Sequence, residues 1–60
     1  MNDYEHLSYK KGREQARAYL MIHTMAQALA DIEAFTADTA FNRGFRDLII
    51  EIHQLMYEEN

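Results

Sequence analysis

Helix-breaking residues are almost absent from this sequence. Its 60 residues include no proline and only two glycines, Gly12 and Gly44. Residue types that favour helix, such as alanine, leucine, glutamate and arginine, recur along the whole chain. No run alternates apolar and polar residues with the period of two that a half-buried strand needs. The sequence therefore predicts an all-α protein.

Apolar residues recur with helical spacing in two segments, at about 100° per residue. The first line consists of Ala18, Ile22, Met25, Leu29 and Ile32. The second consists of Phe41, Phe45, Leu48, Ile52 and Leu55. Between the two lines, "TADT" contains residue types that cap helix N-termini. We therefore expect a helix over 13–35, a turn over 36–39 and a helix over 39–58.

Two interpretations remain open for the opening segment, 1–12. Its Asn-Asp pair can cap a helix, and Tyr4 and Leu7 continue the first apolar line backwards. Gly12, however, costs about 1 kcal/mol in a helix interior. The segment is therefore either a frayed extension of the first helix or a short separate helix that folds back. The sequence slightly favours a helix that bends near Gly12.

A short link makes consecutive helices antiparallel neighbours, so a helical hairpin is expected. Residues whose numbers sum to about 75 then lie side by side, which places Arg17 beside Glu58. Exposed pairs of this kind contribute roughly 0.2–1 kcal/mol each, which sets orientation but does not hold the fold together. Gly44 is expected to let Ala28 and Ile32 approach closely from the first helix.

Both helices carry more apolar surface than one hairpin can bury. Ile50 and Tyr57 lie opposite the main apolar line of the second helix. A helix that is apolar nearly all round is normally buried, and a chain this short buries only about 60% of its unfolded surface. We therefore expect a homodimer, a four-helix bundle. Its expected interface consists of Tyr19, His23, Ala26, Ala30, Ile50, His53 and Tyr57. The alternative is that Ile50 and Tyr57 are ordinary scattered surface residues.

The charge pattern bears on the kind of partner. The formal net charge is −4, which disfavours general binding to nucleic acid. A basic cluster interleaved with tyrosines nevertheless provides an alternative, an RNA- or DNA-binding dimer. That cluster consists of Lys10, Lys11, Arg13 and Arg17.

No catalytic, cofactor or metal motif is visible. His23 and His53 are expected at matching heights in the hairpin, but the Glu-x-x-His spacing of metal sites in helical bundles is absent. Asp47 and Glu51 form a carboxylate pair, which a solvated helix face explains. There is no nucleophile with a base and an orienting group. The sequence predicts no enzyme, no cofactor and no metal.

Composition suggests a setting and a role. No apolar run approaches the roughly 20 residues that span a bilayer, and the N-terminus lacks a signal-peptide pattern. The chain contains no cysteine, which fits a reducing cytoplasm, and Met1 is expected to be the native start. Short acidic chains like this are common among phage and plasmid accessory proteins. We therefore expect a protein–protein adaptor or inhibitor; a structural subunit of a larger assembly stays open.

Overall fold

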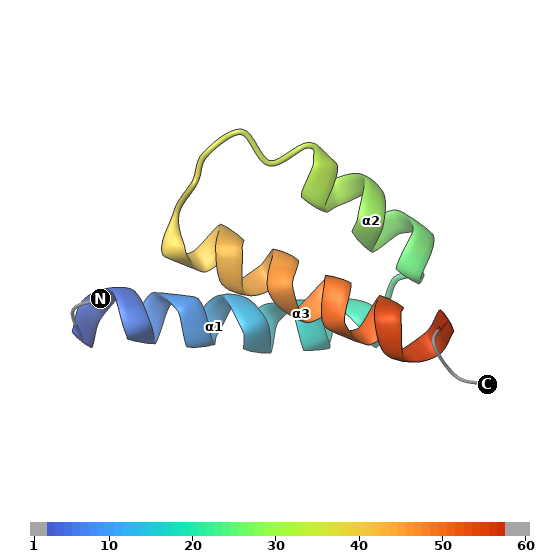
Figure 1. Cartoon of the computed structure of the whole chain (residues 1–60), viewed down its shortest axis with the longest axis horizontal. Helices are drawn as coiled ribbons and strands as arrows, with labels where there is room; N and C mark the ends of the chain where they lie inside the picture. Colours follow the sequence, from blue (N-terminus) through green and yellow to red (C-terminus); the bar gives the residue numbers. More distant parts are fainter. Residues whose placement is uncertain (1–2, 58–60) are drawn as a thin grey trace.

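The computed structural model describes residues 3–57 and contains three helices (Figure 1). They are α1 (Asp3–Leu20), α2 (Met25–Glu33) and α3 (Ala40–Tyr57). No strand occurs within these residues, so the predicted all-α class is confirmed. None of the three helices is long and apolar enough to cross a membrane.

The two long helices, α1 and α3, lie side by side and run in the same direction (Figure 1). Their polar contacts keep a constant offset: Tyr9 donates a hydrogen bond to Asp47, and one turn later Arg13 bonds Glu51. The segment 1–12, where it is described, is therefore not a frayed extension or a short separate helix. It forms the first half of α1.

Two glycines allow α1 and α3 to approach closely. A Cβ atom at Gly12 would lie 2.9 Å from the backbone carbonyl carbon of Phe41, and one at Gly44 would lie 3.0 Å from that of Tyr9. The carbonyl oxygens would be nearer still. The expected bend at Gly12 is wrong, because Gly12 lies within a continuous helix and serves packing. The prediction that Ala28 approaches Gly44 closely is also wrong, because the backbone that approaches Gly44 belongs to α1.

The predicted helix over 13–35 is interrupted at residues 21–24. Thr24 has an extended backbone (φ −83°, ψ 161°) and caps the N-terminus of α2. Its hydroxyl oxygen accepts from the Gln27 amide at 3.1 Å, and the Gln27 side chain accepts from the Thr24 amide at 3.2 Å. This reciprocal capping box satisfies amides that a helix start otherwise leaves free. The predicted helix over 13–35 is therefore wrong only around residues 21–24, since the apolar periodicity itself continues through them.

The expected antiparallel hairpin is formed by α2 and α3, joined by residues 34–39 (Figure 1). The rings of Phe35 and Phe45 pack edge to face with centroids 5.5 Å apart. At the start of α3, the Thr39 hydroxyl accepts from the Asn42 amide at 3.1 Å. The sequence placed this helix at 39–58; its last expected residue, Glu58, and with it the Arg17–Glu58 pair, lie outside the described residues.

The core between the three helices is small. Among the described residues only four apolar side chains are buried: Ala16, Ala28, Phe45 and Ile49. Ile49 is the one large side chain that is fully buried. Half-buried neighbours such as Leu20, Leu29 and Leu48 pack around this cluster. So small a core leaves little reserve of stability in a single chain.

Candidate interaction surface

The end of the molecule where α1 and α3 finish carries no charged side chain in its described part. Two six-residue segments lie there, "LMIHTM" at 20–25 and "IHQLMY" at 52–57 (Figure 1). Neither contains Asp, Glu, Lys or Arg. We call these twelve residues the charge-free end. In sequence they are followed by Glu58 and Glu59, which lie outside the described residues.

Large apolar side chains are exposed at the charge-free end. Met21 and Ile22, in the break between α1 and α2, are 85% and 80% exposed. Leu55 is 68% and Tyr57 69% exposed on the last turns of α3. Single exposed apolar residues are ordinary, whereas large contiguous apolar patches are a feature of interaction sites in general. The charge-free end is therefore the candidate surface.

The sequence analysis did not predict that Ile22 and Leu55 would be exposed. It assigned Ile22 and Leu55 to the main apolar lines and so to the core. The chain turn at 21–24 and the shortness of α2 leave them uncovered instead. The sequence feature that could have identified this surface is the absence of charged residues from the two segments 20–25 and 52–57. An analysis of apolar periodicity does not detect that feature.

Tyr19 and His23 were expected at an interface between chains. The Tyr19 ring is half-buried, packs edge to face on Phe45 at 5.6 Å and stacks on His23 at 4.2 Å. Its hydroxyl donates a hydrogen bond to Asp31, which ties α1 to α2 and raises the pKa of Tyr19. Most of the Tyr19 side chain therefore serves the fold of its own chain. His23 remains exposed and contacts the Gln27 side chain at 3.2 Å.

The other expected interface residues lie on α2 and α3. Ala26 and Ala30 are exposed on α2, and Ile50 is 37% exposed on α3. The rings of His53 and Tyr57 lie 4.6 Å apart, one turn from each other at the charge-free end. The structure thus gathers His23, His53 and Tyr57 at this end, while Ile50 lies two residues before the charge-free end begins on α3.

The basic cluster lies on α1. Lys10, Arg13 and Arg17 line a cavity of about 230 Å³ with Glu14 and Leu48. Both terminal nitrogens of Arg13 donate to the Glu51 carboxylate, at 2.7 and 2.9 Å. Lys10, Lys11 and Arg17 are exposed. One of the four cations is thus already neutralised by α3.

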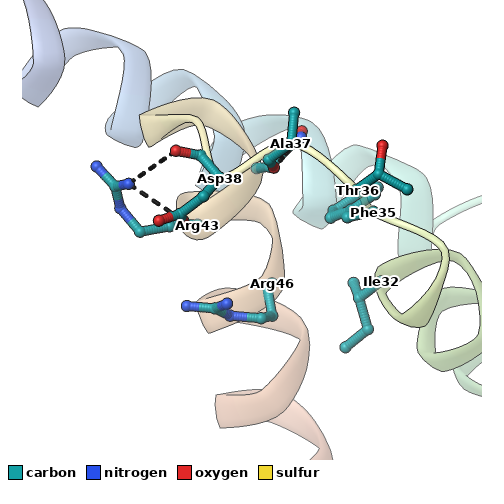
Figure 2. Close-up of a pocket in the computed structure, with 8 residues that line it drawn as sticks. Ile32, Phe35, Thr36, Ala37, Asp38, Arg43 and Arg46 are labelled. Carbon is teal, nitrogen blue, oxygen red and sulfur yellow. Dashed lines mark hydrogen bonds and ion pairs between the residues drawn. The ribbon is translucent and has the colours of Figure 1, made fainter.

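A cavity of about 380 Å³ lies between the 34–39 loop and α3. Figure 2 shows Arg43 reaching back to Asp38, whose backbone carbonyl and carboxylate oxygens accept at 3.1 and 3.2 Å. Arg46 lies 3.6 Å from Asp47. Each guanidinium therefore has an acidic neighbour in the same chain. The lining residues are Ile32, Phe35, Thr36, Ala37, Asp38, Asn42, Arg43 and Arg46.

The carboxylates that the sequence offered as a pair are both hydrogen-bonded to α1. Asp47 accepts from the Tyr9 hydroxyl at 2.6 Å, and Glu51 accepts from Arg13. No group of three or more His, Asp or Glu side chains comes together within residues 3–57. His23 and His53 therefore gain no third metal ligand from the described part of the chain.

The Arg13–Glu51 pair makes stability depend on pH. Hydrogen bonds from Arg13 hold the pKa of the Glu51 carboxyl below its ordinary value of 4.5, although partial desolvation opposes this. Because the folded-state pKa is the lower one, the stabilisation is present above pH 4.5 and is lost as the pH falls through the folded-state pKa. Glu51→Gln should lower the free energy of unfolding at neutral pH by under about 1 kcal/mol, as for exposed pairs.

Urea titrations at neutral and acid pH measure this difference. The wild type and Glu51→Gln should converge in acid, because protonated Glu51 no longer attracts Arg13. Glu33→Gln, at an exposed position on α2, is the control and should match the wild type throughout. A Glu51→Gln deficit that persists unchanged in acid would show that packing, and not charge, is involved.

Comparison with known proteins adds no relative: no protein-family model, curated protein or solved structure matches this chain.

Proposed function

We propose that this chain is a small non-enzymatic protein–protein interaction module that binds its partner through the charge-free end. The supporting observation is the exposure of Met21, Ile22, Leu55 and Tyr57 together at one end of a protein with few buried apolar side chains. An adaptor or an inhibitor of a host protein, of the phage or plasmid accessory type, uses a surface of this kind.

The chemistry of the surface favours a protein partner. Interface cores are depleted of charge and enriched in methionine. The charge-free end contains no Asp, Glu, Lys or Arg and has three of the chain's four methionines. A nucleic-acid partner requires free cations for phosphate contacts. Here Arg13 is paired with Glu51, and the chain carries a net charge of −4. The RNA- or DNA-binding alternative therefore has weaker support.

Leu55→Glu tests the proposal, because it places a charge in the centre of the charge-free end without disturbing a buried residue. We expect Leu55→Glu to abolish capture of the partner from the native host, or to abolish self-association measured by sedimentation if the partner is a second copy. The physical reason is the cost of burying a charge without a counter-ion. Circular dichroism should show an unchanged helix content.

Two further variants complete the design. Gln15→Glu adds the same charge at an exposed position on α1 and should leave binding unchanged. Ile50→Glu tests the interface face expected from the sequence. Loss of binding in Ile50→Glu but not in Leu55→Glu would assign the interface to the Ile50 face and overturn the charge-free end.

A further inference from the structure

The break between α1 and α2 keeps helical hydrogen bonds at both of its edges. The His23 amide still donates to the Tyr19 carbonyl at 2.8 Å, with helical spacing. The Ala28 amide already donates to the Thr24 carbonyl at 3.0 Å. The amides of Met21 and Ile22 donate three residues back instead, to the carbonyls of Ala18 and Tyr19 at 3.1 and 3.0 Å. The capping box occupies the amides of Thr24 and Gln27. The interruption is therefore centred on Thr24, the residue with the extended backbone.

Nothing in the sequence of the break requires a turn. Residues 21–24 read "MIHT", with no glycine or proline, and no residue described by the structure has a positive φ. The apolar line of Ala18, Ile22 and Met25 also continues through the break with helical spacing. If Thr24 took a helical backbone, α1 and α2 would become one helix over 3–33.

A straight helix over 3–33 separates α3 from the α1 of its own chain. In the present structure the start of α3 lies beside the start of α1, where Ser8 and Ala40 line one cavity. Straightening would carry residue 33 roughly 38 Å along the helix axis from Ser8. The seven residue steps from 33 to 40 reach at most about 25 Å. The α1–α3 packing could then be made only with another chain.

We propose that the partner of this protein is a second copy, and that the two copies exchange α1. In each chain α1 and α2 form one helix, and α3 stays on its own α2. The α1 of the other copy takes the place beside α3, with the Gly12–Gly44 crossing and the Arg13–Glu51 pair now made between chains. The product is a four-helix bundle. This inference rests on the proposed function and names its partner.

The exposed residues of the break supply the reason for exchange. In the single chain Met21 and Ile22 are 85% and 80% exposed. In the exchanged dimer the two straightened segments run past each other about the two-fold axis, so these side chains gain a partner surface. Because residues 20–25 carry no charge, the symmetric pairing brings no like charges together. The capping box of Thr24 and Gln27 opposes the change, since it exists only in the bent form.

Single cysteines distinguish the two arrangements, because the natural sequence has none. One chain carries Arg13→Cys and a second, tagged chain carries Glu51→Cys. The two are unfolded together, refolded, and treated with a short bis-maleimide. Exchange predicts a covalent heterodimer on a denaturing gel. Gln15→Cys in place of Arg13→Cys, at an exposed position on the same helix, should give none. A cross-linked yield no greater than with Gln15→Cys would overturn the inference.

Variants of the break provide an independent readout by sedimentation equilibrium. Thr24→Ala removes the cap from the bent form in both chains, so it should tighten dimerisation by on the order of 30-fold. Ile22→Gly disfavours a continuous helix and removes the apolar side chain, so it should weaken dimerisation at least tenfold.

Different experimental outcomes would contradict the exchange of α1 and the proposed function. A dimer without the specific cross-link, disrupted by Leu55→Glu, would contradict exchange and leave the charge-free end as the interface. A protein that is monomeric at high micromolar concentration, for wild type and Thr24→Ala alike, would also contradict exchange. Capture of a host protein that is lost in Leu55→Glu would then still support the proposed function.

Discussion

Gly44→Ala should unfold most of this protein at room temperature. The added methyl carbon would overlap the backbone of Tyr9, lying 3.0 Å from its carbonyl carbon and closer to its oxygen. Backbone cannot turn aside as a side chain can, so α1 and α3 must separate along their whole crossing. Overpacking a core typically costs 1–3 kcal/mol, and a backbone clash lies at or beyond the upper end, roughly 3 kcal/mol or more. Chemical denaturation monitored by circular dichroism measures the loss.

The sign of the change in unfolding free energy in Gly44→Ala distinguishes a close helix crossing from an ordinary helix position. Intrinsic helix propensity alone would make alanine better than glycine by about 1 kcal/mol. Gly12→Ala should behave like Gly44→Ala, because it meets the backbone of Phe41 from the other side of the crossing. Gln15→Ala, on an exposed part of α1, is the matched control and should stay within about 0.5 kcal/mol of the wild type. A stabilised Gly44→Ala protein would rule out the close crossing.

Ile49→Ala should be the most destabilising deletion of an aliphatic side chain. Ile49 is fully buried and belongs to the small core cluster. Truncation of a buried isoleucine to alanine costs about 2–5 kcal/mol, and a core with so few members has little capacity to close the cavity. Against the marginal stability of a short domain, this removes most of the folded population. The measurement is the free energy of unfolding from urea titration.

The adjacent residue provides the control. Ile50→Ala deletes the same atoms from a side chain that is 37% exposed and is not a member of the core cluster. At a concentration where the chain is monomeric, it should cost under about 1 kcal/mol. Equal losses in Ile49→Ala and Ile50→Ala would mean that α3 is rotated relative to the packing described, or that Ile50 is buried by a partner.

The helical class followed from the sequence because it depends on local properties. Residue propensities and apolar spacing predicted helices through most of the described residues, and the start of α3 followed from Thr39 as a cap. The break at Thr24 was missed because a capping box competes with helix propagation at a single residue. Threonine and glutamine at this spacing do not outweigh an uninterrupted apolar line when only periodicity is considered.

The pairing of α1 with α3 was beyond sequence reasoning for a different reason. Short links favour antiparallel neighbours. These two helices are parallel because α2, which follows α1 and precedes α3 in the chain, runs in the opposite direction to both. Gly12 then looked like a defect in a helix, although it is half of the crossing with Gly44. Ile22 and Leu55 of the charge-free end were assigned to the core on the same assumption of one long hairpin.

The parallel arrangement of α1 and α3 has a consequence for how the protein folds. Tyr9 and Asp47 are 38 positions apart in a chain of 60, so the main packing interface joins distant parts of the chain. Helical proteins usually fold fast because their contacts are local, whereas contacts of long separation slow the search. Because synthesis proceeds from the N-terminus, α1 leaves the ribosome before α3 does. For that interval its glycine-bearing face has no partner within its own chain, and a neighbouring polypeptide on the same message is the nearest source of one.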